Sequence, residues 1–176
     1  MPDAPGLELI AQELNRRFEG SVLGTYYEHE QGALVVNPEH VVDVLGWLRD
    51  TPGQEYRFLS SVHGADYLPA EPRFGVHYEL LCMARVERLR VKAALADPGG
   101  EELPELGSCT DLFPTANFQE REVYDFFGIV FRGHPDLRRI QMPEDYVGWP
   151  QRRDFPMGGE PVLFTHNEVE TPAWWE

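Results

Sequence analysis

The sequence predicts an α/β (α+β) chain in which helices pack on one mixed or antiparallel sheet, followed by a long proline-rich extended arm. Two observations carry this prediction. Stretches of helical and of strand periodicity alternate along residues 1–128, and both patterns stop in residues 129–176. A chain of 176 residues suits a single domain with a sizeable core. We therefore expect a globular domain at 1–128 and an extended C-terminal arm at 129–176.

The start of the chain predicts a helix, a hairpin and a second helix. The first helix, which Gly20 can end, is marked by apolar residues at helical spacing: Leu7, Ile10, Ala11, Leu14 and Phe18. Residues 21–30 and 33–36 flank Gln31-Gly32 and indicate a β-hairpin. Asn37-Pro38 is typical of a helix start. One face of the helix that follows is lined by Val41, Val44, Leu45 and Leu48.

Three strands are predicted next, at 56–63, 73–85 and 88–95. The residues of the second strand that we expect to face the core are Phe74, Val76, Tyr78, Leu80, Cys82 and Ala84. In the third strand the inward residues are Leu89, Val91, Ala93 and Leu95. Arg88, Arg90 and Lys92 point outward from it, and we expect this basic face to be solvated, with a binding role as the alternative.

Residues 115–127 return to a helical pattern, and Gly128 suits a left-handed C-terminal residue. The prolines beyond it, at 135, 143, 150, 156, 161 and 172, exclude a long helix or a central strand. This arm nevertheless carries many large apolar side chains, among them Phe131, Trp149 and Trp174. Because exposing so much apolar surface to water is unfavourable, the arm must lie on protein. It wraps its own domain or, as we favour, lies on a partner.

Charge supports a protein partner for the arm. The arginines that stand apart from the acidic body of the chain are Arg132, Arg138, Arg139, Arg152 and Arg153. Guanidinium groups bind carboxylates in a two-pronged geometry, which suits a protein interface. The alternative is that Arg138 or Arg139 pairs with Glu122 or Asp125 within the chain.

Composition excludes several classes of protein. A net charge of −15 opposes binding to nucleic acid or to anionic lipid. The apolar runs are shorter than a membrane span needs, and no signal peptide is visible, so we expect a cytoplasmic chain. Cys82 and Cys109 lack the spacing of a zinc or iron-sulfur site and are expected to be buried thiols.

No local motif assembles a nucleophile, a base and an oxyanion site, and no phosphate-binding loop is present. One alternative from another class is a stand-alone metal-dependent hydrolase that uses His63, Asp66, His77 or His134. His134 lies in a predicted Gly-His-Pro turn, where its ring is expected to cap backbone groups or contact a partner.

The most informative stretch is "EREVYDFFGIVFRGHPDLRRI", residues 120–140. It resembles the signature of the family of the C subunit, or 30 kDa subunit, of proton-pumping NADH-quinone oxidoreductase, respiratory complex I. The resemblance continues through residues 142–156, and the upstream order of helices and strands is similar to the family's α/β domain. Trp149 departs from the His that the family usually has in a Gly-His-Pro turn, and Gln141 from a commonly aliphatic residue.

The resemblance implies structural and interfacial roles for the positions that match the motif. These are Glu120, Arg121, Glu122, Asp125, Phe126, Phe127, His134, Pro135, Asp136, Arg138, Arg139, Ile140, Glu144, Asp145, Arg152, Arg153 and Asp154.

As a family member the chain would be a scaffold without catalytic residues, and it would bind no metal or cofactor itself. The implied complex uses FMN, iron-sulfur clusters, NADH and quinone. The implied partners are the D subunit of the complex and, near the arm, the B and I subunits, on the cytoplasmic side of the inner membrane. The same signature occurs in membrane-bound nickel-iron hydrogenases and related ferredoxin or quinone oxidoreductases, so the equivalent scaffold in such a complex is a further alternative.

Overall fold

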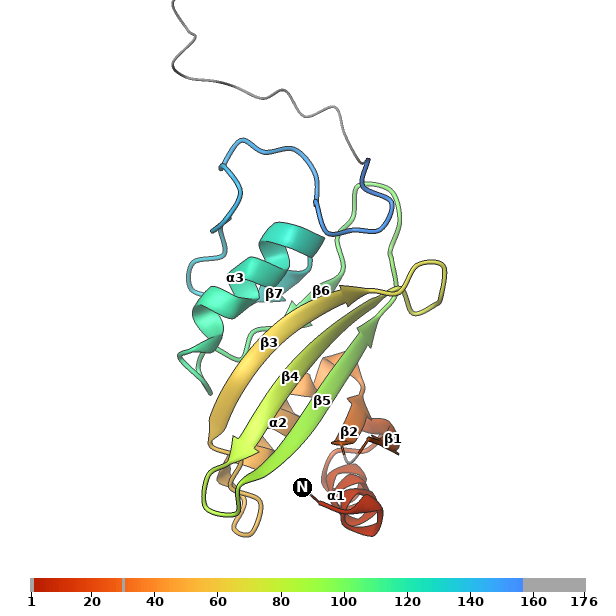
Figure 1. Cartoon of the computed structure of the whole chain (residues 1–176), viewed down its shortest axis with the longest axis vertical. Helices are drawn as coiled ribbons and strands as arrows, with labels where there is room; N and C mark the ends of the chain where they lie inside the picture. Colours follow the sequence, from red (N-terminus) through yellow and green to blue (C-terminus); the bar gives the residue numbers. More distant parts are fainter. Residues whose placement is uncertain (1, 30, 157–176) are drawn as a thin grey trace, which may run out of the picture.

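The computed structural model describes residues 2–29 and 31–156 of the chain (Figure 1). Its elements, in chain order, are α1 (Ala4–Arg17), β1 (Val22–Glu28), β2 (Gln31–Val36), a 3-10 turn (Pro38–His40), α2 (Val41–Asp50), β3 (Phe58–Asp66), β4 (Phe74–Cys82), β5 (Glu87–Leu95), β6 (Glu105–Gly107), α3 (Ala116–Phe127) and β7 (Val130–Arg132). The predicted α/β class, with helices packed on one main sheet, is confirmed.

The main sheet has five strands in the order β1-β2-β5-β4-β3. It is mixed, because β2 pairs with β5 in parallel whereas the other neighbours are antiparallel. The predicted hairpin is present, but its turn is not at Gln31-Gly32. These two residues pair with Glu28 and Tyr27, and the turn begins at His29, which has a φ of 51°.

One face of the sheet forms the core with the helices. The predicted inward residues of β4 and β5 are buried, from Phe74 at 0% exposed to Leu95 at 6%. Ala84 is an exception, because β4 ends at Cys82 and Ala84 is exposed in the turn that follows. In Figure 1 α2 lies behind β4 and β5, and the buried faces of α1 and α2 carry the apolar residues that their spacing predicted.

Helix α3 packs beside β3, the edge strand of the sheet (Figure 1). The backbone N–H of Val62 on β3 donates to Oε1 of Gln119 on α3 at 2.6 Å. This bond occupies a donor on an otherwise open sheet edge. Helix and strand approach closely at Gly64, where an added Cβ would lie 2.6 Å from Cδ2 of Phe127. The helix ends at Gly128, whose φ of 70° is the predicted left-handed conformation.

The chain beyond α3 returns to its own domain. Strand β7 pairs in parallel with β6, a pairing that the sequence did not predict, and it carries the buried Phe131. Further along, the N–H of Gln151 donates to the carbonyl of Phe126 at 3.2 Å. Residues 129–156 therefore lie on the domain itself. The predicted contact of the arm with partner subunits stays a prediction, and residues 157–176 lie outside the described residues.

The close approach at Gly64 gives a test of how α3 is packed. Gly64→Ala should lower the free energy of unfolding by about 1–3 kcal/mol, because the new methyl group would overlap the Phe127 ring. Gly24→Ala is the matched control, since a Cβ there meets no atom within 4 Å. Urea denaturation of both variants measures the difference, and equal stability of the two would contradict this packing.

Candidate functional site

The signature helix α3 turns most of its charged residues inward. Glu120 and Asp125 are 0% exposed and Arg121 is 9% exposed, whereas Glu122 lies at the surface. Buried charges are costly unless they are paired and hydrogen-bonded. The contacts of these three side chains therefore determine what this stretch of sequence does.

The Asp125 carboxylate holds a turn of the arm against α3. Its Oδ2 accepts hydrogen bonds from the backbone N–H groups of Ile140 (3.1 Å), Gln141 (2.7 Å) and Met142 (2.9 Å). Its Oδ1 accepts from the Arg139 guanidinium at 2.8 Å. Burial acts to raise the pKa of Asp125, but these hydrogen bonds outweigh it and lower the pKa below its ordinary value. Asp125 is thus held as an anion inside the protein.

Arg139 joins three parts of the structure. Besides Asp125, its guanidinium donates to the carbonyl of Gly148 at 2.8 Å. It lies over the Trp149 ring with 4.6 Å to the centroid, a cation–π contact. The sequence offered, as an alternative, an ion pair within the chain between Arg138 or Arg139 and Glu122 or Asp125. The structure contains such a pair, and it joins Arg139 to Asp125. Arg138 instead pairs at the surface with Asp136, at 3.0 Å.

Arg121 holds the same turn from its other side. Its Nε and Nη2 donate to the carbonyls of Arg138 and Arg139, both at 3.1 Å. Two consecutive carbonyls of the arm are thereby satisfied by a side chain of α3, while the following N–H groups are satisfied by Asp125. One turn of helix therefore supplies both the donor and the acceptor that fix this part of the arm.

Glu120 fastens α3 to the loop that follows β6. It accepts hydrogen bonds from the Ser108 hydroxyl at 2.7 Å and from the Cys109 N–H at 2.8 Å. Burial raises the pKa of Glu120, and the two hydrogen bonds only partly offset it. Cys109 is fully buried, as is Cys82, which agrees with the expected buried thiols.

His134 caps backbone groups, as its place in the Gly-His-Pro turn predicted. Its Nδ1 accepts from the N–H of Asp136 at 3.0 Å, and its Nε2 lies 3.0 Å from the carbonyl of Asn117 on α3. A carbonyl can only accept, so Nε2 carries the proton and the ring is neutral in this arrangement. The ring therefore links the start of the turn to the helix.

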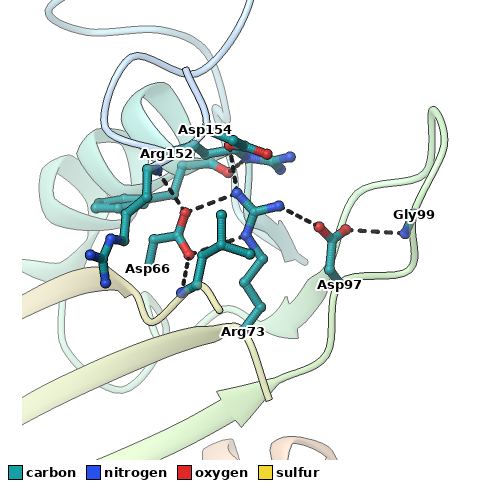
Figure 2. Close-up of polar contacts among 9 residues, drawn as sticks. Asp66, Arg73, Asp97, Gly99, Arg152 and Asp154 are labelled. Atoms are coloured by element: carbon teal, nitrogen blue, oxygen red, sulfur yellow. Dashed lines mark hydrogen bonds and ion pairs between the residues drawn. The ribbon is translucent and has the colours of Figure 1, made fainter. Parts of the chain in front are cut away.

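A second buried cluster attaches residues 152–154 to the end of the sheet, and Figure 2 shows it around Arg73. The Arg73 guanidinium contacts Asp66 at 2.9 Å, Asp97 at 2.7 Å and Asp154 at 2.6 Å. Asp66 also accepts from the N–H of Arg153 at 2.8 Å. Burial acts to raise the pKa of Asp66, but the bonds from Arg73 and from backbone N–H groups lower it to about 2.

Trp149 fills the space between these two clusters. Its ring covers Gly128, where an added Cβ would lie 2.5 Å from the indole, and it meets Tyr124 edge-on at 5.3 Å. Arg152, whose Nε donates to the carbonyl of Phe127 at 2.7 Å, lies over the Phe74 ring at 4.9 Å. Trp149, one of the two residues at which the sequence departs from the family pattern, is thus a packing residue here.

The structure divides the motif residues into an inner and an outer set. The inner set, which bonds or packs against the domain, comprises Glu120, Arg121, Asp125, Phe126, Phe127, His134, Arg139 and Arg152. The outer set, which lies at the surface, comprises Glu122, Pro135, Asp136, Arg138, Ile140, Glu144, Asp145, Arg153 and Asp154. Asp154 belongs to this set although it also reaches Arg73.

Sequence reasoning missed Arg73 and Asp97, and it considered Asp66 only as a metal ligand. Asp66 is instead occupied by Arg73. His63 and His77 stack with ring centroids 5.0 Å apart, while the bonds of His134 lead to α3 and its own turn. Within residues 2–29 and 31–156 no three His, Cys, Asp or Glu side chains are grouped as a metal ion would require. In the described part of the chain, the four side chains named for the hydrolase alternative are therefore not assembled into one metal site.

No helix in the described part of the chain is long and apolar enough to cross a membrane.

Taken together, the fold and the site define a small α/β protein whose signature charges fasten a C-terminal segment onto its own domain. The family model described as "Respiratory-chain NADH dehydrogenase, 30 Kd subunit" matches residues 34–161. The chain therefore belongs to this family.

Curated relatives agree with this assignment. The C subunit of NADH-quinone oxidoreductase from Roseiflexus castenholzii is 50% identical over 159 residues, which cover 90% of this chain and 89% of the relative. The protein of the same name in Herpetosiphon aurantiacus is 47% identical over 135 residues, 77% of each chain. Among solved structures, a chain of an archaeal membrane-bound sulfane sulfur reductase shares the fold, with a TM-score of 0.62, 21% identity and 85% of each chain covered.

The Asp125 contacts give a stability prediction. Asp125→Asn should lower the free energy of unfolding by about 3 kcal/mol, because it leaves Arg139 without its buried counter-charge and weakens the acceptor for three N–H groups. Asp136→Asn is the matched control, since its pair with Arg138 is exposed and worth at most about 1 kcal/mol. Equal losses in urea denaturation would show that the Asp125 contacts do not hold the arm.

The Arg73 cluster gives a pH prediction. Because the pKa of Asp66 is lowered from 3.8 to about 2, its ion pair stabilises the fold fully above pH 3.8 and ceases to do so as the pH falls through 2. The difference in free energy of unfolding between wild type and Arg73→Gln should therefore shrink over this range. Arg57→Gln, which removes an exposed pair with Glu55, should show a small difference at every pH. A pH-independent difference for Arg73→Gln would contradict the role of the cluster.

Proposed function

We propose that this chain is a non-catalytic scaffold in the peripheral arm of NADH-quinone oxidoreductase, docked to the D subunit of that complex. The observation that carries this proposal is the use of the signature charges. Glu120, Arg121 and Asp125 form hydrogen bonds with loops of the same chain and hold those loops in place. A nucleophile or proton-transfer group would need access to a reactant, whereas these groups are enclosed and already bonded. The names of the relatives, each a C subunit of NADH-quinone oxidoreductase, supply the complex.

The rigid turn presents side chains that suit a protein interface. We define the docking surface as Phe118, Arg138, Ile140 and Val147. Phe118 is 63% exposed, Ile140 38% and Val147 88%, which is a high exposure for large apolar groups. Arg138 adds a guanidinium whose ion-pair partner within residues 2–29 and 31–156 is the exposed Asp136. An apolar patch with an arginine beside it is the composition that protein interfaces favour.

Hydrogen bonds and ring contacts connect the members of this docking surface. Arg121 lies over the Phe118 ring at 5.9 Å and donates to the carbonyl of Arg138, two residues before Ile140. The amide of Gln141 donates to Glu122 on the exposed side of α3 at 2.9 Å. Val147 precedes Gly148, which Arg139 holds. The surface is therefore preformed, which lowers the entropy cost of docking.

In this proposal the cofactors of the complex, FMN and the iron-sulfur clusters, lie in other subunits, and this chain supports electron transfer from NADH to quinone by position alone. The D subunit covers the docking surface, and the B and I subunits lie near the end of the arm. The chain would be attached peripherally on the cytoplasmic side of the inner membrane through these partners. Relatives up to 50% identical favour this complex over a hydrogenase or a ferredoxin oxidoreductase.

A charge placed in the docking surface tests the proposal. Ile140→Asp should weaken binding to the co-expressed D subunit at least tenfold, because a carboxylate would be desolvated in an apolar contact. Leu23→Asp, a change at another exposed apolar residue, which lies on β1 and is 63% exposed, should leave binding unchanged. Affinity of the purified pair is the measurement, with thermal unfolding as the check that both variants fold.

Turnover distinguishes a scaffold from a catalytic chain. In complexes that contain Ile140→Asp, the amount of assembled peripheral arm should fall while NADH-quinone turnover per assembled complex stays at the wild-type value. Normal assembly with lost turnover would refute the scaffold role.

A further inference from the structure

The second face of the main sheet carries no helix in the described part of the chain. Figure 1 shows β3, β4 and β5 in front of α2, with their outer side open toward the viewer. Pairing places residues of neighbouring strands in rows across this face. One row runs Phe58, Leu81 and Arg88, and the next contains Glu79 and Arg90. We call this face, bounded by these residues and by His63 and Lys92, the outer sheet face.

The outer sheet face is basic although the chain is strongly acidic. Arg88, Arg90 and Lys92 occupy alternate positions of β5, and the strand pairing places His63 in the row of His77 and Lys92. Among the described residues, the carboxylates on this face are Glu79, which pairs with Arg90, and Glu28 at the far strand β1. The chain as a whole has a net charge of −15. A local excess of bases on such a chain attracts carboxylates of another molecule.

Lys92, Arg90 and Arg88 differ in the contacts that their charged groups already make within the chain. Lys92 lies over the Tyr67 ring at 4.1 Å, and Arg90 is paired with Glu79. Arg88 makes no ion pair with any residue in 2–29 or 31–156, and its side chain is exposed. It borders a hollow of about 350 Å³ that spans four strands and whose other polar lining residues are Gln31, Ser60, His63, Glu79 and Arg90. The Glu79 carboxylate in this lining is already paired with Arg90. The other side chains offer amide, hydroxyl, ring and guanidinium donors around one space.

We infer that the outer sheet face is a second interface, which receives an extended acidic segment of a partner protein. A carboxylate of that segment would enter the hollow and bind the free guanidinium of Arg88 in a two-pronged geometry. Successive outward residues of a strand lie about 7 Å apart, so a segment with acids at alternate positions matches the spacing of Arg88, Arg90 and Lys92. This inference does not rest on the identity of the complex.

The apolar members of the face favour a polypeptide over a small anion. Phe58 is 48% exposed and lies in the same row as Leu81 and Arg88. A polypeptide with alternating residues can cover this apolar end while its acids reach the bases. A free carboxylate would contact only the donors in the hollow.

A peptide pair tests the inference on the full chain. The probe is an acetylated and amidated hexapeptide in which serine and glutamate alternate, and its comparison peptide has glutamine in place of glutamate. We expect the glutamate peptide to bind at least tenfold more tightly than the glutamine peptide, and to shift the NMR signals of the Arg88 and Arg90 side-chain N–H groups. Raised salt should weaken this binding.

Arg88→Gln should weaken binding of the glutamate peptide at least tenfold and leave thermal unfolding unchanged, because Arg88 is exposed. Arg16→Gln on α1, which removes another exposed arginine, should leave binding unchanged. Equal binding of the two peptides, or equal effects of the two variants, would overturn the inference. Free glutamate that binds as tightly as the peptide would also overturn it, because the hollow would then be a small-anion site.

Discussion

The C-terminal part of this structure depends on the hydrogen bonds and the ion pair of one side chain, the ionised carboxylate of Asp125, which is buried at the side of α3. A buried carboxylate is unfavourable without partners, and here a guanidinium and three consecutive backbone N–H groups supply them. The carboxylate in turn fixes the positions of these partners, which all belong to residues 139–142 of the arm. Residues 139–142 have no regular secondary structure of their own, so the helix provides the hydrogen bonds that a strand or helix would otherwise give them.

The other contacts of the arm extend this arrangement. Arg121 satisfies the carbonyls just before the Asp125 turn, and Trp149 packs over the glycine that ends α3. Arg73 then secures Asp154 at the end of the sheet. A segment with frequent prolines is thereby ordered by side chains of the domain rather than by its own backbone pairing. Its outward residues keep a fixed geometry, which is what a docking surface for another protein requires.

The elements of the domain could be predicted because their signals are local. Alternating apolar residues in β4 and β5 and helical spacing in α1, α2 and α3 each lie within one short stretch. Strands β6 and β7 have three residues each, too few to show a period. Arg73 binds partners that lie 7, 24 and 81 positions away, so nothing near it in the sequence indicates the cluster. The signature stretch is visible in the sequence, but the inward direction of its charges depends on where the arm folds back. The sequence alone therefore does not distinguish pairing of these charges within the chain from pairing with a partner.

Native-state hydrogen exchange in the isolated chain tests the central claim most directly. If Asp125 orders the arm without help from another protein, the amides of Ile140, Gln141 and Met142 should exchange slowly in the monomer, with protection close to that of core amides in β4. Addition of the D subunit should then change their protection little. Fast exchange in the monomer, with protection appearing only when the D subunit is bound, would contradict the account and would mean that the partner orders this segment.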